Sequence, residues 1–222
     1  MNVSEAIATR KTTRAFRSDP VPLETVKQIL TLAARAPSGG NLQPWKAYVL
    51  VGEARDELIR RVGEARKQHP MGEPPEYHIY PPHLTEPYRT RRFRVGEQMY
   101  ATMGISREDK AARLKAFARN WEFFGSPVGM IFTIDRRLNQ GSWIDYGMFL
   151  QNIMVAARAR GLDTCPQAAF TQFHRVIAEV LGLEGDEMVV CGMSLGHADP
   201  DAVENQLVTE REPVQGFVRY YE

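Results

Sequence analysis

The stretch SWIDYGMFLQNIMVAARAR, residues 142–160, decides the fold class because it is long and its hydrophobic pattern is helical. The apolar side chains on one side of this helix are Tyr146, Phe149, Leu150, Ile153, Met154 and Ala157. Ile144, Met148 and Val155 extend the apolar surface onto another side. The pattern predicts a helix that is buried nearly all round and ends at Gly161.

Three short apolar or β-rich runs, at residues 46–51, 126–134 and 188–195, predict buried strands. Helical patterns separate these runs, at residues 3–11, 23–35, 53–67 and 175–181. Strands separated by helices indicate an α/β or α+β sheet with covered faces. We find no internal repeat and no interdomain linker, so we expect one domain over residues 1–222.

Residues 69–124 differ from the rest of the chain. Six prolines between residues 70 and 87 deny the first part regular hydrogen bonding. Two helices are expected after it, at about 91–103 and 106–124, separated by Gly104 and a Ser106-x-x-Asp109 capping pattern. We expect this segment to form a helical cap or lid inserted into the domain.

Composition excludes several classes of protein. The 28 basic and 27 acidic residues leave a formal charge of +1, so no overall field favours nucleic acid or an anionic membrane. The longest apolar runs are far shorter than the roughly 20 residues of a membrane-spanning helix. The two cysteines, Cys165 and Cys191, show no metal-ligand spacing. We therefore expect a reduced, cytoplasmic protein without a membrane or nucleic-acid partner.

The common catalytic motifs are missing. The sequence contains no GxGxxG after a strand, no P-loop and no HExxH. The five histidines occur singly, and none is assigned to catalysis or to a metal.

Three segments have the residue types that hold an anionic, planar ligand. Arg10-Lys11-Thr12-Thr13-Arg14 offers cations and hydroxyls to a phosphate, although the same residues also suit a solvated helix end. Residues 37–45, PSGGNLQPW, combine glycines with polar side chains that can read a heterocycle. Residues 164–169, TCPQAA, together with Gly196 and Arg211, can border a flat ring. An ordinary loop is the alternative for the last two.

Taken in order, these segments resemble the flavin-binding signature of the nitroreductase superfamily, and within it the nitrobenzene nitroreductase group. The resemblance extends over nearly the whole chain. It is carried by the three segments above and by YGMFLQNIM at 146–154, GLDTC at 161–165 and GMSLG at 192–196.

The resemblance implies an α+β protein with a three-layer α/β/α fold and a mainly antiparallel central sheet. It also implies a homodimer in which long central helices pack together and two FMN sites lie at the interface. Arg10, Lys11, Thr12 and Arg211 would then hold the phosphate, and Arg14 would stabilise charge on the flavin pyrimidine ring. Pro37, Ser38, Gly39, Asn41 and Gln43 would contact FMN from the other subunit, and Pro166, Gln167, Ala168 and Gly196 would border the isoalloxazine.

The reaction implied is ping-pong. NADH or NADPH delivers hydride to the flavin and leaves, and a small aromatic acceptor then takes the same place. A nitro group would be reduced to nitroso and then to hydroxylamine, and no protein acid or base is strictly required. The sequence leaves open which nicotinamide cofactor is used.

The acceptor is expected to meet aromatic residues of the cap segment. The residues proposed to contact it are Gly40, Tyr88, Phe93, Tyr100, Trp121, Phe123 and Phe124, with Tyr77 and Tyr80 in the same aromatic group. Packing inside the cap is the alternative for each of them. The arginines between residues 89 and 94 either attract an anionic acceptor or nicotinamide phosphate or form a solvated helix face.

Parts of the sequence fit other functions. Iodotyrosine dehalogenases resemble the chain at Asn120-Trp121, but Phe123 stands where they have a substrate-binding lysine, which favours an uncharged acceptor. A related flavin reductase acting on quinones is a second alternative. A flavin-binding sensor or storage protein is the non-enzymatic one.

Overall fold

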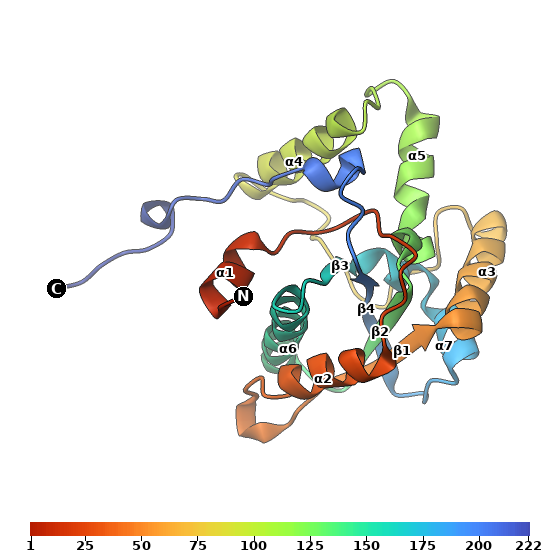
Figure 1. Cartoon of the computed structure of the whole chain (residues 1–222), viewed down its shortest axis with the longest axis horizontal. Coiled ribbons are helices and arrows are strands. Elements are labelled where there is room, and N and C mark those ends of the chain that lie inside the picture. The colour runs from red at the N-terminus through yellow and green to blue at the C-terminus, as the bar shows by residue number, and fades with distance from the viewer.

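The computed structural model describes all residues, 1–222, and its core is a four-stranded antiparallel sheet (Figure 1). The strands are β1 (Lys46–Val51), β2 (Val128–Asp135), β3 (Asp163–Gln167) and β4 (Glu187–Gly196). Their order in the sheet is β1-β2-β4-β3, so β1 and β3 are the edge strands.

Helices cover both faces of the sheet. Helices α2 (Leu23–Ala33) and α6 (Gln140–Arg158) pack on one face, and α3 (Gly52–Gln68) and α7 (His174–Leu181) lie on the other. The alternation along β2 explains this, because Met130 and Phe132 belong to the core under α2 and α6 whereas Ile131 belongs to the core under α3 and α7. The α+β, three-layer prediction is confirmed.

Helix α6 is not buried all round in the single chain. Its buried residues face the sheet, but Ile144 is 68% exposed and Gly147 and Gln151 are exposed beside it. The apolar surface that extends around this helix is therefore open on one side.

The segment expected to be a loop at residues 164–169 contains a strand. Strand β3 pairs with β4 over five residues, and Pro166 lies within it, opposite Met193. Proline has no N–H to donate, so it is compatible only with an edge strand, which is where β3 lies. The proline concealed the strand from pattern reasoning.

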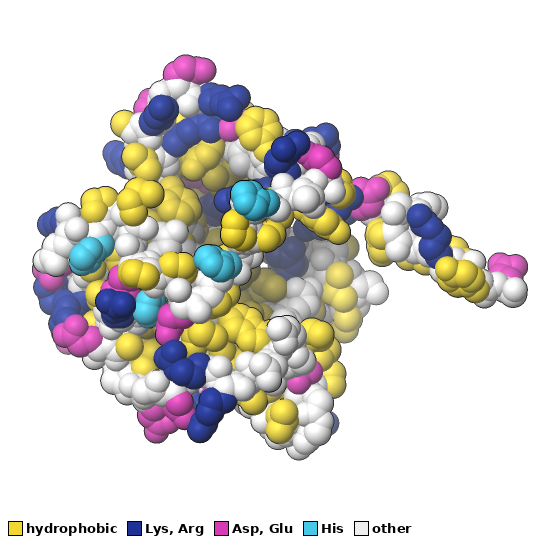
Figure 2. Space-filling view, turned by 180° about the vertical axis from the view of Figure 1, so that it is seen from behind, with side chains coloured by type: hydrophobic (Ala, Val, Ile, Leu, Met, Phe, Trp, Pro, Cys, Tyr) yellow, Lys and Arg dark blue, Asp and Glu magenta, His cyan; other side chains and the backbone are white.

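Part of the segment at residues 69–124 projects from the layers. Its helices are α4 (Tyr88–Thr102) and α5 (Lys110–Ala118), and neither has a buried residue. The single helix expected from 106 to 124 is shorter, because Asp109 caps α5 and a 3₁₀ segment, Arg119–Gly125, follows it. Figure 2 shows Lys and Arg side chains gathered over this upper part of the molecule.

The two ends of the chain lie apart from the core. Helix α1 (Val3–Thr9) has one buried residue, Ala6. The last residues extend away from the body, and Tyr221 is 93% exposed (Figure 1). No helix combines the length and the hydropathy needed to cross a membrane.

Candidate functional site

A cavity of about 760 Å³ lies where the end of α1, the C-terminal half of α6 and the C-terminal segment meet. All five residues that were predicted to hold a phosphate or stabilise the flavin line it, and they are Arg10, Lys11, Thr12, Arg14 and Arg211. Gln151, Arg158 and Thr209 also line it. Residues 200 positions apart in the sequence therefore share one cationic site.

Most of this positive charge has no anionic partner. Arg158 lies 3.2 Å from Asp163, but no carboxylate or carbonyl accepts from the guanidinium of Arg10 or Arg14. Burial, followed by the nearby charge of Arg211, lowers the pKa of Arg10. A site with this excess of cations suits a doubly charged phosphate.

Asn205 fixes the backbone of this site. Its side-chain oxygen accepts from the N–H groups of Arg14 at 2.8 Å and Ala15 at 3.2 Å. Its side-chain nitrogen donates to the carbonyls of Ala15 at 2.8 Å and Asp199 at 2.9 Å. Lys11 donates to the backbone carbonyl of the same residue. The buried amide thus has all four hydrogen bonds that it can make.

The glycine-containing loop is held in an unusual conformation. Gly39 donates its N–H to the Asp145 carboxylate on α6 at 3.1 Å, and the Ser38 hydroxyl accepts from the N–H of Gln43 at 3.0 Å. Gly40, Asn41 and Gln43 all have positive φ angles, 58°, 56° and 50°. Such strain in a loop is maintained by surrounding contacts and is concentrated at binding sites. None of these residues lines the cationic cavity of the same chain.

Comparison with known proteins agrees with this geometry. The profile of the Nitroreductase family matches residues 7–197. The chain belongs to the nitroreductase family. Chloronitrobenzene nitroreductase from Comamonas testosteroni is 45% identical over 98% of this chain and 96% of its own length, and nitrobenzene nitroreductase from Ectopseudomonas oleovorans is 44% identical over the same shares. The crystal structure of the FMN and NADPH-dependent nitroreductase NfnB from Sphingopyxis sp. strain HMH superposes with a TM-score of 0.97 at 38% identity, with both chains fully covered.

Within this nitroreductase fold, the residues predicted to border the isoalloxazine divide into two groups. Pro166 is exposed and Ala168 partly exposed next to it, so both remain candidates. Gln167 donates its side-chain amide to the Asn120 carbonyl and accepts from Ser194, so its side chain is held by the protein. Gly196 is buried, and a Cβ there would lie 2.8 Å from Pro127. Its small size serves packing against Pro127, and its contact with the cofactor stays a prediction.

Phe93 and Tyr100 line a shallow hollow of about 720 Å³ on α4, together with His83. Arginines cover their rings, with Arg107 5.3 Å from the Phe93 centroid and Arg113 4.4 Å from that of Tyr100. Tyr88, at the start of α4, is 59% exposed. These three aromatic residues stay candidates for acceptor binding.

Trp121 and Phe123 do not face this hollow. Trp121 is 5% exposed, packs edge-on against Phe173 and donates to the Ala169 carbonyl at 3.0 Å. Phe123 has no exposed surface and stacks on Phe170. The structure therefore makes both residues part of the core under α3 and α7, contrary to their predicted role in substrate binding.

Two further aromatic residues are distinguished by their neighbours. Phe124 lines a narrow crevice with Arg14, which keeps it beside the proposed flavin site. Tyr77 donates to the Val190 carbonyl at 2.5 Å and packs edge-on against Trp143, so it belongs to the core.

Sequence reasoning did not select four residues that the structure places at or behind the cavity, and they are Gln151, Arg158, Asn205 and Thr209. Gln151 and Arg158 are seven residues apart and thus share one face of α6, a spacing that was available as a signal. No local pattern marks Asn205, because its partners are about 190 residues away.

Proposed function

We propose that this protein is an FMN-dependent oxidoreductase that accepts hydride from a nicotinamide cofactor and reduces nitroaromatic compounds. The observation that carries the proposal is the cationic cavity, where Arg10, Lys11, Arg14 and Arg211 converge. The relatives described above are nitroreductases of chloronitrobenzene and nitrobenzene and an FMN and NADPH-dependent nitroreductase, which supports the same function.

The residues present fit FMN. The guanidinium group of Arg10 lacks a protein acceptor, and a phosphate supplies oxygens for it. Thr12 lines the same cavity, and its hydroxyl can add a neutral donor. FMN bound here would supply two-electron hydride chemistry.

The protein's own residues would then bind FMN, orient it and stabilise its charges. Arg10, Lys11 and Arg211 neutralise the phosphate end. Arg14 extends from the same segment to the crevice beside Phe124, where a cation favours negative charge on the flavin pyrimidine ring.

We further propose that the active unit is a homodimer. Ile144 on α6 is 68% exposed, and Val3 and Ile7 on α1 are 69% and 53% exposed, so apolar surface on these helices lacks a cover. The loop at Gly39–Asn41 carries cofactor-reading groups but does not line its own chain's cavity. A second copy of the chain would cover the apolar surface of α1 and α6, and its cationic cavity would lie next to the loop at Gly39–Asn41.

A charged amino-acid substrate is disfavoured. A dehalogenase of iodotyrosine would need a cation at position 123, whereas Phe123 is fully buried under Gly129. An uncharged ring or a nitroaromatic acid suits the arginine-covered aromatics of α4 better.

We also propose that the protein works in the cytoplasm. Both Cys165 and Cys191 are free and buried. Free thiols are the rule in a reducing compartment.

The test is an anaerobic stopped-flow experiment. The purified flavoprotein is reduced with NADPH and then mixed with nitrobenzene. We expect loss of flavin absorbance, full reoxidation and formation of hydroxylaminobenzene. A protein that cannot be loaded with FMN would contradict the proposal, and one that NADPH reduces but nitrobenzene does not reoxidise would restrict it to quinones or other acceptors.

A further inference from the structure

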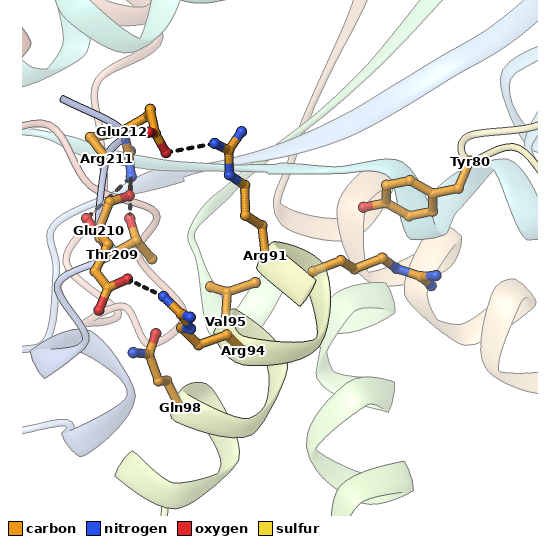
Figure 3. Close-up of a pocket in the computed structure, with 10 residues that line it drawn as sticks. Tyr80, Arg91, Arg94, Val95, Gln98, Thr209, Glu210, Arg211 and Glu212 are labelled. Atoms are coloured by element: carbon orange, nitrogen blue, oxygen red, sulfur yellow. Dashed lines mark hydrogen bonds and ion pairs between the residues drawn. The ribbon is translucent and has the colours of Figure 1, made fainter. Parts of the chain in front are cut away.

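A second, smaller cavity of about 430 Å³ lies between α4 and the C-terminal segment Thr209–Glu212 (Figure 3). Arg91, Arg94 and Gln98 reach it from one face of α4, at the spacing of successive helical turns. Four arginines and two glutamates line it, so cations exceed carboxylates by two; the arginines are Arg91, Arg92, Arg94 and Arg211.

The two carboxylates are weakly held. Arg91 pairs with Glu212 at 2.6 Å and Arg94 with Glu210 at 3.0 Å, and all four side chains are between 42% and 66% exposed. Exposed ion pairs contribute little to stability, because water and salt screen them. An incoming anion can therefore replace either carboxylate at small cost.

The other two arginines have no carboxylate partner. The Arg92 guanidinium lies over the Tyr80 ring, 4.2 Å from its centroid. Arg211 donates only to Thr209 and to the Glu210 carbonyl. Stacking on an aromatic face leaves the in-plane N–H groups of a guanidinium available to an anion.

This cavity adjoins the proposed flavin site. Thr209 and Arg211 line both the 430 Å³ cavity and the 760 Å³ cationic cavity. The two cavities are therefore neighbours, and a substrate that extends from the cationic cavity past these two residues would meet the arginines of α4.

We propose that the cavity lined by Arg91, Arg92, Arg94 and Arg211 is an anion subsite of the active site, in which an anionic group of a substrate displaces Glu210 or Glu212. Two sources supply such a group: the 2′-phosphate of NADPH and the carboxylate of a nitroaromatic acid. Guanidinium groups bind both in the same paired geometry. The inference rests on the proposed function, since it names what that active site selects.

The test measures four rate constants in the two separate half-reactions. Flavin reduction is compared for NADPH and NADH, and flavin reoxidation is compared for 4-nitrobenzoate and nitrobenzene. Each pair of substrates differs in one anionic group, so the ratio within a pair isolates that group. For Arg91→Gln and Arg94→Gln we expect at least one ratio to fall by about ten- to a hundredfold, the range of a hydrogen bond to a charged group.

A second pair of variants distinguishes an anion subsite from ion pairs that only attach the C-terminal segment to α4. Glu212→Gln and Glu210→Gln break the same ion pairs but free the arginines, so the affected ratio should rise. If the pairs only fastened the C-terminal segment to α4, all four variants would shift the rates in the same direction. Rate changes in the same direction in all four variants would therefore overturn the proposal.

Arg60→Gln is the control. Arg60 lies on α3 and loses exposed ion pairs with Glu57 and Glu64, but it lines none of the cavities described above. We expect both of its substrate ratios to stay within about twofold of the wild type, as for a remote screened charge. A fall confined to NADPH assigns the phosphate and a fall confined to 4-nitrobenzoate assigns the carboxylate, whereas unchanged ratios in every variant refute the subsite. Failure of the wild type to turn over any of these substrates would refute the proposed function itself.

Discussion

The side-chain oxygen of Asn205 accepts a hydrogen bond from the backbone N–H of Arg14 at 2.8 Å, across 191 positions of sequence. This bond ties the C-terminal part of the chain to the segment that carries the proposed flavin-binding cations. It makes the position of Arg14 depend on a residue that touches no ligand.

Replacement of Asn205 by leucine should weaken FMN binding by about tenfold or more. The change removes four side-chain hydrogen bonds and leaves buried backbone groups unpaired, each at a cost of about 1–3 kcal/mol. FMN titration followed by flavin fluorescence measures the affinity, and thermal unfolding measures the stability.

A double-mutant cycle identifies the route of this effect. If Asn205 acts by positioning Arg14, its replacement in an Arg14→Gln background should change FMN affinity much less than in the wild type. Additive effects would show instead that Asn205 has only a general structural role. Tyr48→Phe, at the distant end of the sheet, controls for lost stability.

Arg10→Gln and Arg211→Gln should each raise the FMN dissociation constant by about ten- to a hundredfold, since each removes a charged donor from the phosphate site. Their effects should not add, because the two cations lie close enough for Arg211 to lower the pKa of Arg10. Riboflavin, which lacks the phosphate, is the control ligand. Equal losses of riboflavin and FMN would contradict the assignment.

Asp145→Ala should loosen the loop at Gly39–Asn41. The Asp145 carboxylate accepts from the Gly39 N–H at 3.1 Å and is 8% exposed, so its loss leaves a donor unpaired at about 1–3 kcal/mol. Proteolysis within the loop should become faster, and FMN affinity should fall if the loop reaches the partner's cofactor. Asp145→Asn, which keeps an acceptor oxygen, should restore most of the protection.

Acid should destabilise the sheet through Glu187. Burial alone would raise its pKa, but hydrogen bonds from Thr133, Lys46 and Tyr48 outweigh burial and hold the pKa below its ordinary value of 4.5. A carboxyl with a lowered folded-state pKa stabilises the fold above 4.5, and this contribution is lost as pH falls through the folded value. Urea unfolding between about pH 3 and pH 7 should therefore show a smaller acid-dependent loss in Tyr48→Phe, together with a cost of about 1 kcal/mol at neutral pH.

Gly129→Ala should destabilise the protein by about 1–3 kcal/mol, the usual cost of overpacking. A Cβ at this position would lie 2.6 Å from the buried Phe123 ring, which has no room to move because it stacks on Phe170. Gly63→Ala, with no atom within 4 Å of the added Cβ, is the control for thermal unfolding. A similar melting temperature in both variants would contradict this account of Phe123.

The local sequence pattern was sufficient to predict some strands and not others. Strand β1 was predicted with its observed bounds, Lys46–Val51, because a β-rich run there is followed directly by a charged helix. Strand β3 was missed, because its pairing with β4 is non-local and Pro166 argues against a strand unless the edge position is known.

The candidate functional site also contains residues that the sequence predicted and residues whose place depends on non-local contacts. The cations Arg10, Lys11, Arg14 and Arg211 were predicted from residue type and family resemblance, and the fold brings them to one cavity. For the aromatic residues, type alone does not separate Phe93, which is 53% exposed, from Phe123, which has no exposed surface. That difference depends on which side of the sheet each segment meets.

The edge of strand β3 also affects how the protein behaves without its cofactor. The Thr13 N–H donates to the Thr164 carbonyl at 3.1 Å, so the segment that supplies the phosphate-binding cations also covers this edge. Uncovered strand edges pair with other chains. Because FMN would hold that segment in place, loss of the cofactor would free an edge for strand-to-strand association, with Pro166 as its only built-in obstacle. We therefore expect the apoprotein to be more exposed to aggregation than the protein with FMN bound.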